Sequence, residues 1–188
     1  MDQKLKLNRS SFFAAAAAVA VFFAILVISP RLASAETVVP PALAQKMLFV
    51  EPDNSQMGEG AFDTPFFDAK EAPRTLAGFQ GTGVVLNLWA TWCAPCVREM
   101  PALNRLSAKL NGRGVQVVAL SEDRKALDKV PAFYAENNIT HLAVYYDLKS
   151  QLSRKLGVVG LPTTVLIAAD GRVVGIVKGV VEWDDDAI

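Results

Sequence analysis

Two cysteines, Cys93 and Cys96, are the residues of this chain whose type and spacing are best suited to chemistry. Thiols at this spacing can form and break a disulfide with little backbone movement, and the thiolate is the reactive form. A zinc site usually needs about four ligands, whereas the chain offers only these two cysteines and one histidine, His141. A purely structural disulfide would close a very short loop and add little stability. We therefore interpret the pair as a redox-active dithiol without metal or cofactor, and His141 as a loop residue.

The pair lies where a buried strand passes into a helix. Val84–Trp89 is an apolar run typical of a strand that is buried on both faces. Apolar residues then recur at helical spacing from Val97 to Leu110, which predicts a helix. Free N–H groups and the positive end of the helix dipole favour an anion at the start of a helix. We therefore expect Cys93, at the edge of the turn, to be the attacking thiolate, and Cys96, one turn into the helix, to resolve the mixed disulfide.

The elements around this strand and helix predict an α/β domain. A strand over Val115–Ser121 follows a glycine-containing helix stop, and the three elements form a right-handed parallel β-α-β unit. Other elements are expected as a short edge strand over 62–67, a helical turn over 75–79, a helix over 125–137, a strand over 143–146, a short helix over 150–156, and strands over 164–168 and 173–180 that are joined by an Asp170-Gly171 hairpin turn.

The first 35 residues have the pattern of a membrane-targeting segment. Lys4, Lys6 and Arg9 precede a long apolar stretch, Phe12–Ile28, which places the N-terminus in the cytoplasm and the rest of the chain outside. Ala33–Ala35 offers a signal-peptide cleavage site. Because the apolar stretch is long, we favour an uncleaved anchor in the inner membrane with the domain facing the periplasm. The alternative is a soluble periplasmic protein that has been cleaved near Ala35.

Three parts of the chain are therefore expected: the segment 1–35, a linker over 36–60, and one folded domain over 61–188. The linker is rich in proline and glycine and contains a possible short helix over Ala42–Phe49. Asp184 has the character of a helix N-cap, so we expect a closing helix that is incomplete at Ile188. The 19 basic and 19 acidic residues balance, and this argues against a nucleic-acid partner.

Two motifs now resemble a known family. The sequence W-A-T-W-C-A-P-C ends at Cys96, and G-L-P-T-T follows at 160–164, before the hairpin. Together they resemble the thioredoxin superfamily, and more narrowly the membrane-anchored TlpA/ResA-like thiol-disulfide oxidoreductases, over roughly residues 60–183. The resemblance implies a thioredoxin-like α/β fold with a central mixed sheet flanked by helices. It also implies that the helix and strand over 125–147 form the extra insert of this subgroup.

The resemblance assigns roles to further residues. Pro162 is expected to be a cis-proline that faces the dithiol, which would leave the backbone of Leu161 free to pair with an extended partner segment. Trp92 would shield one side of Cys93. Ala94 and Pro95, between the cysteines, would contact the partner and tune the redox potential.

Two positions depart from the family pattern. Thioredoxin has a buried aspartate where this chain has Asn87, and ResA-type proteins have an acidic residue where this chain has Ala94. Proton exchange at Cys96 therefore cannot use a carboxylate at position 87. Glu99 lies one helical turn after Cys96, and we expect it to be a solvated charge on the helix surface.

The leading functional hypothesis is a periplasm-facing reductase of protein disulfides. By analogy, its partners would be cytochrome c maturation components or copper-site assembly factors of the respiratory oxidase, and a membrane thiol transporter of the CcdA/DsbD type would supply electrons. Three alternatives remain open: an oxidant that forms disulfides, a module that binds Cu(I) through the dithiol, and a peroxide reductase. The copper alternative lacks a third soft ligand nearby, and the peroxide alternative normally has a different cysteine context.

Overall fold

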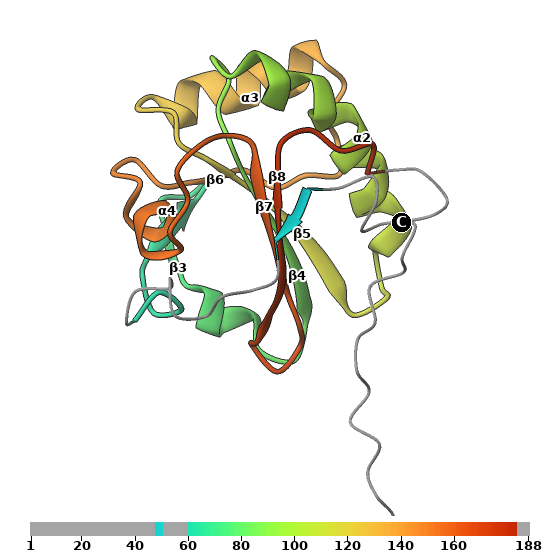
Figure 1. Ribbon diagram of the computed structural model, residues 1–188. Helices are drawn as coiled ribbons and strands as arrows, with labels where there is room; N and C mark the ends of the chain where they lie inside the picture. Colours follow the sequence, from blue (N-terminus) through green and yellow to red (C-terminus); the bar gives the residue numbers. More distant parts are fainter. Residues whose placement is uncertain (1–47, 51–59, 184–188) are drawn as a thin grey trace, which may run out of the picture. The chain divides into compact units, whose positions relative to one another are not determined.

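A mixed eight-stranded sheet forms the centre of the domain (Figure 1). The computed structural model describes residues 48–50 and 60–183. The strands lie in the order β1-β8-β7-β4-β5-β6-β2-β3. Their bounds are β1 Leu48–Val50, β2 Phe66–Asp68, β3 Pro73–Arg74, β4 Gly83–Trp89, β5 Val115–Ser121, β6 Tyr145–Tyr146, β7 Thr163–Ile167 and β8 Val173–Lys178. The helices are η2 Leu76–Phe79, α2 Ala94–Leu110, α3 Ala126–Glu136 and α4 Gln151–Lys155. This arrangement confirms the predicted α/β fold.

The central strand β4 connects the two halves of the sheet. It pairs in parallel with β5 and antiparallel with β7, so its backbone is bonded on both edges. Helix α2 connects β4 to β5, as the β-α-β prediction requires. Because β4 ends at Trp89 and α2 begins at Ala94, the cysteine pair lies at the carboxyl end of the central strand.

Alternate side chains of β4 face two separate cores. Val85 and Trp89 pack in one core with α2 and α3 residues such as Met100 and Val130. Three other β4 residues, Val84, Leu86 and Leu88, belong to the second core, together with residues of η2 and α4. Figure 1 shows α2 and α4 on opposite sides of the sheet. Both faces of β4 are therefore covered, and this explains why the strand is apolar along its length.

The predicted insert is part of the sheet. β6 pairs in parallel with β5 and antiparallel with β2, and α3 lies within the predicted helix over 125–137. The indole of Trp89 stacks on the ring of Tyr134 in α3, with centroids 6.1 Å apart. The insert therefore extends the same core that supports the cysteine pair.

The structure differs from the sequence-based expectation for part of the linker. Residues Leu48–Val50, expected within a linker and its possible helix, form strand β1 and pair antiparallel with β8. A three-residue strand is too short for its periodicity to be recognised in the sequence, and its pairing depends on the open edge of β8. The expected membrane segment 1–35, the rest of the linker up to residue 59 and the closing helix from Asp184 lie outside the described residues. Within the described part of the chain, no helix is long and apolar enough to cross a membrane.

Candidate active site

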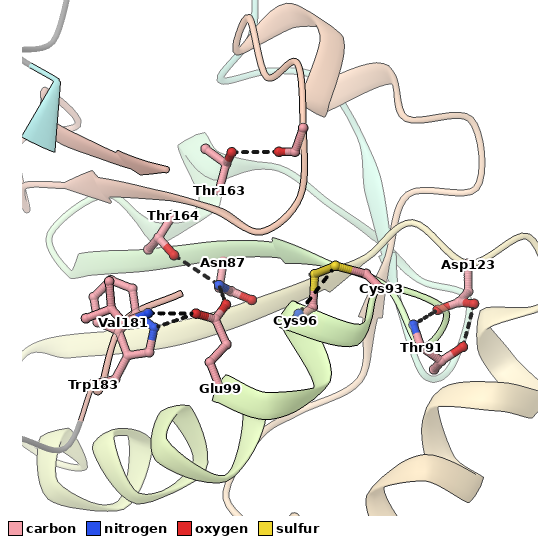
Figure 2. Close-up of a disulfide and its surroundings, with 11 residues drawn as sticks. Asn87, Thr91, Cys93, Cys96, Glu99, Asp123, Thr163, Thr164, Val181 and Trp183 are labelled. Atoms are coloured by element: carbon pink, nitrogen blue, oxygen red, sulfur yellow. Dashed lines mark hydrogen bonds between the residues drawn. A yellow bond between two sulfur atoms is a disulfide. The ribbon is translucent and has the colours of Figure 1, made fainter. Parts of the chain in front are cut away.

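Cys93 and Cys96 form a disulfide at the start of α2, with Cα atoms 5.2 Å apart (Figure 2). Cys93 is the N-cap residue, and its Sγ accepts a hydrogen bond of 3.3 Å from the backbone N–H of Cys96. Pro95 occupies the first turn of α2, where the lack of an N–H costs no helical hydrogen bond. The N–H of Cys96 and the helix dipole would stabilise a negative charge on Cys93 once the disulfide is reduced.

The two sulfurs differ in access to solvent. Cys93 is 6% exposed and Cys96 is completely buried. Cys93 opens into a groove of about 630 Å³, with Trp92, Ala94 and Pro95 along its side. A molecule in the groove therefore meets Cys93, whereas Cys96 does not line the groove.

A second loop lines the same groove. Gly160 and Leu161 face the groove with Cys93, and the Leu161–Pro162 peptide is cis, as the resemblance predicted. The loop is held by a hydrogen bond of 2.7 Å from the hydroxyl of Thr163 to the carbonyl of Gly160. Thr163 then starts β7 beside Leu88 of β4. Pairing between β7 and β4 therefore brings residues 160–162 next to a cysteine almost 70 positions earlier in the chain.

The groove is lined by apolar side chains with a few polar ones among them. Trp92 is 66% exposed and Val159 is 91% exposed. Glu122 also lines the groove, and one oxygen of its carboxylate accepts a hydrogen bond of 3.1 Å from the hydroxyl of Ser150. Its other oxygen has no hydrogen-bond partner within the part of the chain that the structure describes. Sequence reasoning did not identify Glu122, because it reaches the groove only through the pairing of β5 with β4.

Behind the disulfide lies a buried polar network centred on Glu99 (Figure 2). Glu99 is 1% exposed, and its carboxylate accepts three hydrogen bonds. The donors are the amide of Asn87 at 2.7 Å, the indole N–H of Trp183 at 3.2 Å and the backbone N–H of Val181 at 3.3 Å. Burial raises the pKa of Glu99, and the three hydrogen bonds oppose that rise. The result is a carboxyl group that exchanges its proton closer to neutral pH than an ordinary glutamate does.

The expectation that Glu99 is a solvated surface charge is therefore wrong. Its position on α2 contained the signal, because Cys96, Met100 and Leu103 are all buried and Glu99 lies between them on the same helix face. The segment that covers this face, with Val181 and Trp183, comes from the far end of the described chain. The helical pattern alone could not show that this segment supplies the hydrogen bonds that a buried carboxylate requires.

Asn87, at the position where thioredoxin has a buried aspartate, is fully buried. Its amide nitrogen donates to Glu99 and, at 3.0 Å, to the hydroxyl of Thr164. Its oxygen has no hydrogen-bond partner among the described residues. The site thus has a buried carboxyl group after all, supplied by α2 and held in place by the strand amide.

His141 lies away from these groups. It is an exposed loop residue whose backbone N–H donates a bond of 2.7 Å to the Asn104 side chain and whose carbonyl accepts one from the hydroxyl of Ser107. Its assignment as a loop residue is confirmed. Over residues 60–183, no group of three or more histidine, cysteine or acidic side chains has an arrangement that could hold a metal ion.

Comparison with known proteins places this site in a family. Residues 53–187 match the Redoxin family. The ResA thiol-disulfide oxidoreductase of Bacillus thuringiensis subsp. konkukian is 34% identical over 131 residues, which cover 70% of this chain and 75% of that protein. The Geobacillus thermodenitrificans ResA is also 34% identical, over 73% of this chain and 78% of its own length.

A solved structure agrees with these relatives. A crystal structure of a candidate DsbE thiol:disulfide interchange protein from Chlorobium tepidum aligns with a TM-score of 0.58 and 34% identity, covering 66% of this chain and 86% of that one. The fold, the surface-facing Cys93 and the buried Cys96 fit thiol-disulfide exchange. The chain therefore belongs to the Redoxin family, within its ResA-like thiol-disulfide oxidoreductases.

Proposed function

We propose that this oxidoreductase works as a reductase of disulfides in exported proteins. The unequal access of the two sulfurs supports the exchange mechanism, with Cys93 facing the groove and Cys96 buried, and the charges around the pair support the reducing direction. The Cys93 thiolate attacks one sulfur of the partner's disulfide, forms a mixed disulfide and releases the other sulfur as a thiolate. Cys96 then attacks Cys93, restores the Cys93–Cys96 bond and releases the second thiolate. Two electrons pass from the dithiol to the partner, whose thiolates take up two protons.

Glu99 is suited to accept the proton that Cys96 must lose before it attacks. It lies one turn further along α2, it is buried, and its pKa is raised by that burial. A carboxyl group with an elevated pKa is a better proton acceptor than an ordinary glutamate, because it binds the proton more firmly. We propose that Glu99 assists deprotonation of Cys96 within the mixed disulfide, because both residues are buried.

The partner segment is proposed to lie along the groove between Trp92 and Leu161. Both side chains line the groove with Cys93, and Val159 adds a further apolar surface. Exposed apolar side chains beside a reactive group support binding of an extended segment with apolar residues next to its cysteine. Ala94 and Pro95 line the same groove and would contact the segment from the helix side.

The charges around the dithiol support the reducing direction. A strong oxidant needs a reduced form that is stabilised as a thiolate. Here the carboxylate of Glu122 lines the groove of Cys93, and that of Glu99 lies behind Cys96. The guanidinium of Arg154 is the one cation among the described residues that line the groove. The two carboxylates outnumber it, so they limit the thiolate stabilisation that the start of α2 provides and favour a lower reduction potential than that of a strong oxidant.

Location and partners follow from the sequence rather than from the site. The apolar segment over residues 12–28 supports an inner-membrane anchor with the domain in the periplasm, or a soluble periplasmic protein after cleavage. Because the periplasm is kept oxidising, a reductase there needs an electron supply. We propose a membrane thiol transporter of the CcdA/DsbD type as donor. Disulfides of cytochrome c maturation or oxidase copper-site assembly factors are the proposed targets.

The first experiment is the reduction potential of the Cys93–Cys96 pair, measured by equilibrating the full-length chain with a thiol buffer. We expect a value below about −200 mV; for reference, thioredoxin lies at about −270 mV and the oxidant DsbA at about −120 mV. A value near that of DsbA would contradict the reductase and support the disulfide-forming alternative. A Cys96→Ser variant should then trap partners as mixed disulfides, whereas Cys93→Ser should trap none. Stoichiometric Cu(I) binding that Cys93→Ser abolishes, without partner trapping, would favour the copper-binding alternative.

A further inference from the structure

Asp123 is a buried carboxylate that the redox chemistry described above does not use. Asp123 lies two residues beyond the end of β5 and is fully buried. Three short hydrogen bonds reach its two oxygens, from the backbone N–H of Thr91 at 2.8 Å, the hydroxyl of Thr91 at 2.8 Å and the hydroxyl of Ser121 at 3.0 Å, and Lys129 donates a fourth, longer one. The ammonium group of Lys129 lies 3.5 Å away and is half exposed. A charge is buried at this depth only where such partners compensate its lost hydration.

Thr91 is the residue that this carboxylate holds most closely, because it donates both its N–H and its hydroxyl (Figure 2). Thr91 belongs to the turn between β4 and α2, and only Trp92 separates it from Cys93. The turn is closed by one hydrogen bond of 3.1 Å from the N–H of Cys93 to the carbonyl of Ala90. Asp123 therefore ties the loop that carries Trp92 and Cys93 to the neighbouring strand.

The Asp123–Thr91 hydrogen bonds contribute differently to the position of the loop in the oxidised and reduced proteins. In the oxidised protein, the disulfide itself joins Cys93 to the buried Cys96 of α2. After reduction that covalent link is gone, and the position of the loop depends on its non-covalent contacts. The Asp123–Thr91 contact costs less loop entropy in the oxidised protein, where the disulfide already restricts the loop, than in the reduced protein, so it stabilises the oxidised state more.

We propose that Asp123 is a positioning residue, which holds the Thr91–Cys93 loop so that the Cys93 thiol stays close to Cys96 after the disulfide opens. The effect is a higher effective concentration of one thiol at the other. Asp123 thereby favours closure of the Cys93–Cys96 disulfide and speeds release of a partner from the mixed disulfide. The proposal rests on redox cycling of the dithiol, whatever partner is reduced.

Replacement of the Thr91 hydroxyl tests this directly. Thr91→Val keeps the shape of the side chain and removes one hydrogen bond to Asp123, whereas Thr91→Ser keeps the bond. The readout is the equilibrium constant for disulfide formation with oxidised glutathione, measured on the full-length chain. We expect Thr91→Val to lower this constant about fivefold, the equivalent of one hydrogen bond of about 1 kcal/mol, so the potential rises by about 20 mV. Thr91→Ser should remain within about twofold of the wild type.

A second variant removes the charge instead. Asp123→Asn should lower the same constant by about tenfold, since an amide leaves at least one Thr91 donor without an acceptor. Asp147→Asn is the matched control: Asp147 is also buried, and its carboxylate accepts a backbone hydrogen bond of 2.8 Å from Leu152 of α4 instead of one from the Thr91–Cys93 loop. It should lower the free energy of unfolding without changing the glutathione equilibrium.

The kinetics provide the second readout. With glutathione bound to Cys93 as a mixed disulfide, Thr91→Val should slow its release by Cys96 about fivefold. The proposal is overturned if Thr91→Val destabilises the oxidised and reduced proteins equally and leaves the equilibrium constant unchanged, because Asp123 is then purely structural. It is also overturned if Thr91→Ser falls as far as Thr91→Val. Failure of the wild type to form a glutathione-linked couple at all would instead contradict the proposed function.

Discussion

The buried amide of Asn87 donates a hydrogen bond of 2.7 Å to Oε1 of Glu99, so a residue of the central strand holds a carboxyl group of the catalytic helix. A second carboxylate at position 87 would lie within hydrogen-bonding distance of Glu99, and like charges so close cannot both ionise. The neutral amide avoids that conflict and fixes the orientation of the Glu99 side chain. In this protein the buried carboxyl group near the dithiol therefore comes from helix α2, whereas strand β4 contributes an amide.

The raised pKa of Glu99 makes stability depend on pH. The folded protein binds this proton at a higher pH than the unfolded chain does, so the associated stability is complete below the usual value of 4.5 and is lost as pH rises through the folded pKa. We expect the wild type to gain stability relative to Glu99→Gln as the pH falls from about 7 to about 5. Urea unfolding of the oxidised protein at several pH values measures this difference. Glu136→Gln, at the exposed end of α3, is the control, and its free energy of unfolding should change with pH as that of the wild type does. If the free energy of unfolding of Glu99→Gln also changes with pH in parallel with the wild type, the prediction is wrong.

The indole N–H of Trp183 is expected to stabilise the ionised form of Glu99. Trp183→Phe retains an aromatic ring but removes the donor, which should lower the free energy of unfolding at neutral pH by about 1–3 kcal/mol. The loss should be smaller near pH 5, where Glu99 is protonated more often. Trp92→Phe is the control, because Trp92 is 66% exposed, and it should change stability by less than about 0.5 kcal/mol. An equal loss at both pH values would mean that Trp183 contributes by packing alone.

Apolar contact in the groove should matter for protein substrates but not for small thiols. Val159 is 91% exposed, so Val159→Asp should leave the fold intact. We expect reduction of a protein disulfide such as that of insulin to slow about fivefold, for an apolar contact of about 1 kcal/mol, while reaction with dithiothreitol stays unchanged. The matched control is Leu127→Asp, on α3 and outside the groove, where Leu127 is 38% exposed. If both variants behave alike, the groove does not bind the partner.

The two thiols of the reduced protein should react at very different rates. In Cys96→Ser the remaining Cys93 faces the groove beside the helix N-terminus, and we expect iodoacetamide to modify it readily. In Cys93→Ser the remaining Cys96 is buried, and alkylation should be at least about tenfold slower. Mass spectrometry of the quenched reactions gives both rates. Similar rates would contradict the assignment of Cys93 as the attacking sulfur.

The local pattern of the chain was enough to place the cysteine pair. The apolar run into Trp89, the helical spacing after Val97 and the turn between them specify a strand and a helix that meet at Cys93, because backbone geometry determines where consecutive elements join. The G-L-P-T-T motif further along the chain indicated Pro162 through the family resemblance. Most of the predicted strands and helices agree with the structure to within a few residues at their ends.

What surrounds the pair was decided by contacts between distant residues. Glu99 was expected in solvent, but the segment with Trp183 covers it, and Asp123 reaches Thr91 only because β5 pairs with β4. The sequence by itself therefore determined the reactive sulfurs and the elements that carry them, since these depend on neighbouring residues. Tertiary structure alone decided which carboxylates are buried beside those sulfurs, because the burial and hydrogen bonding of a charge depend on every segment packed against it.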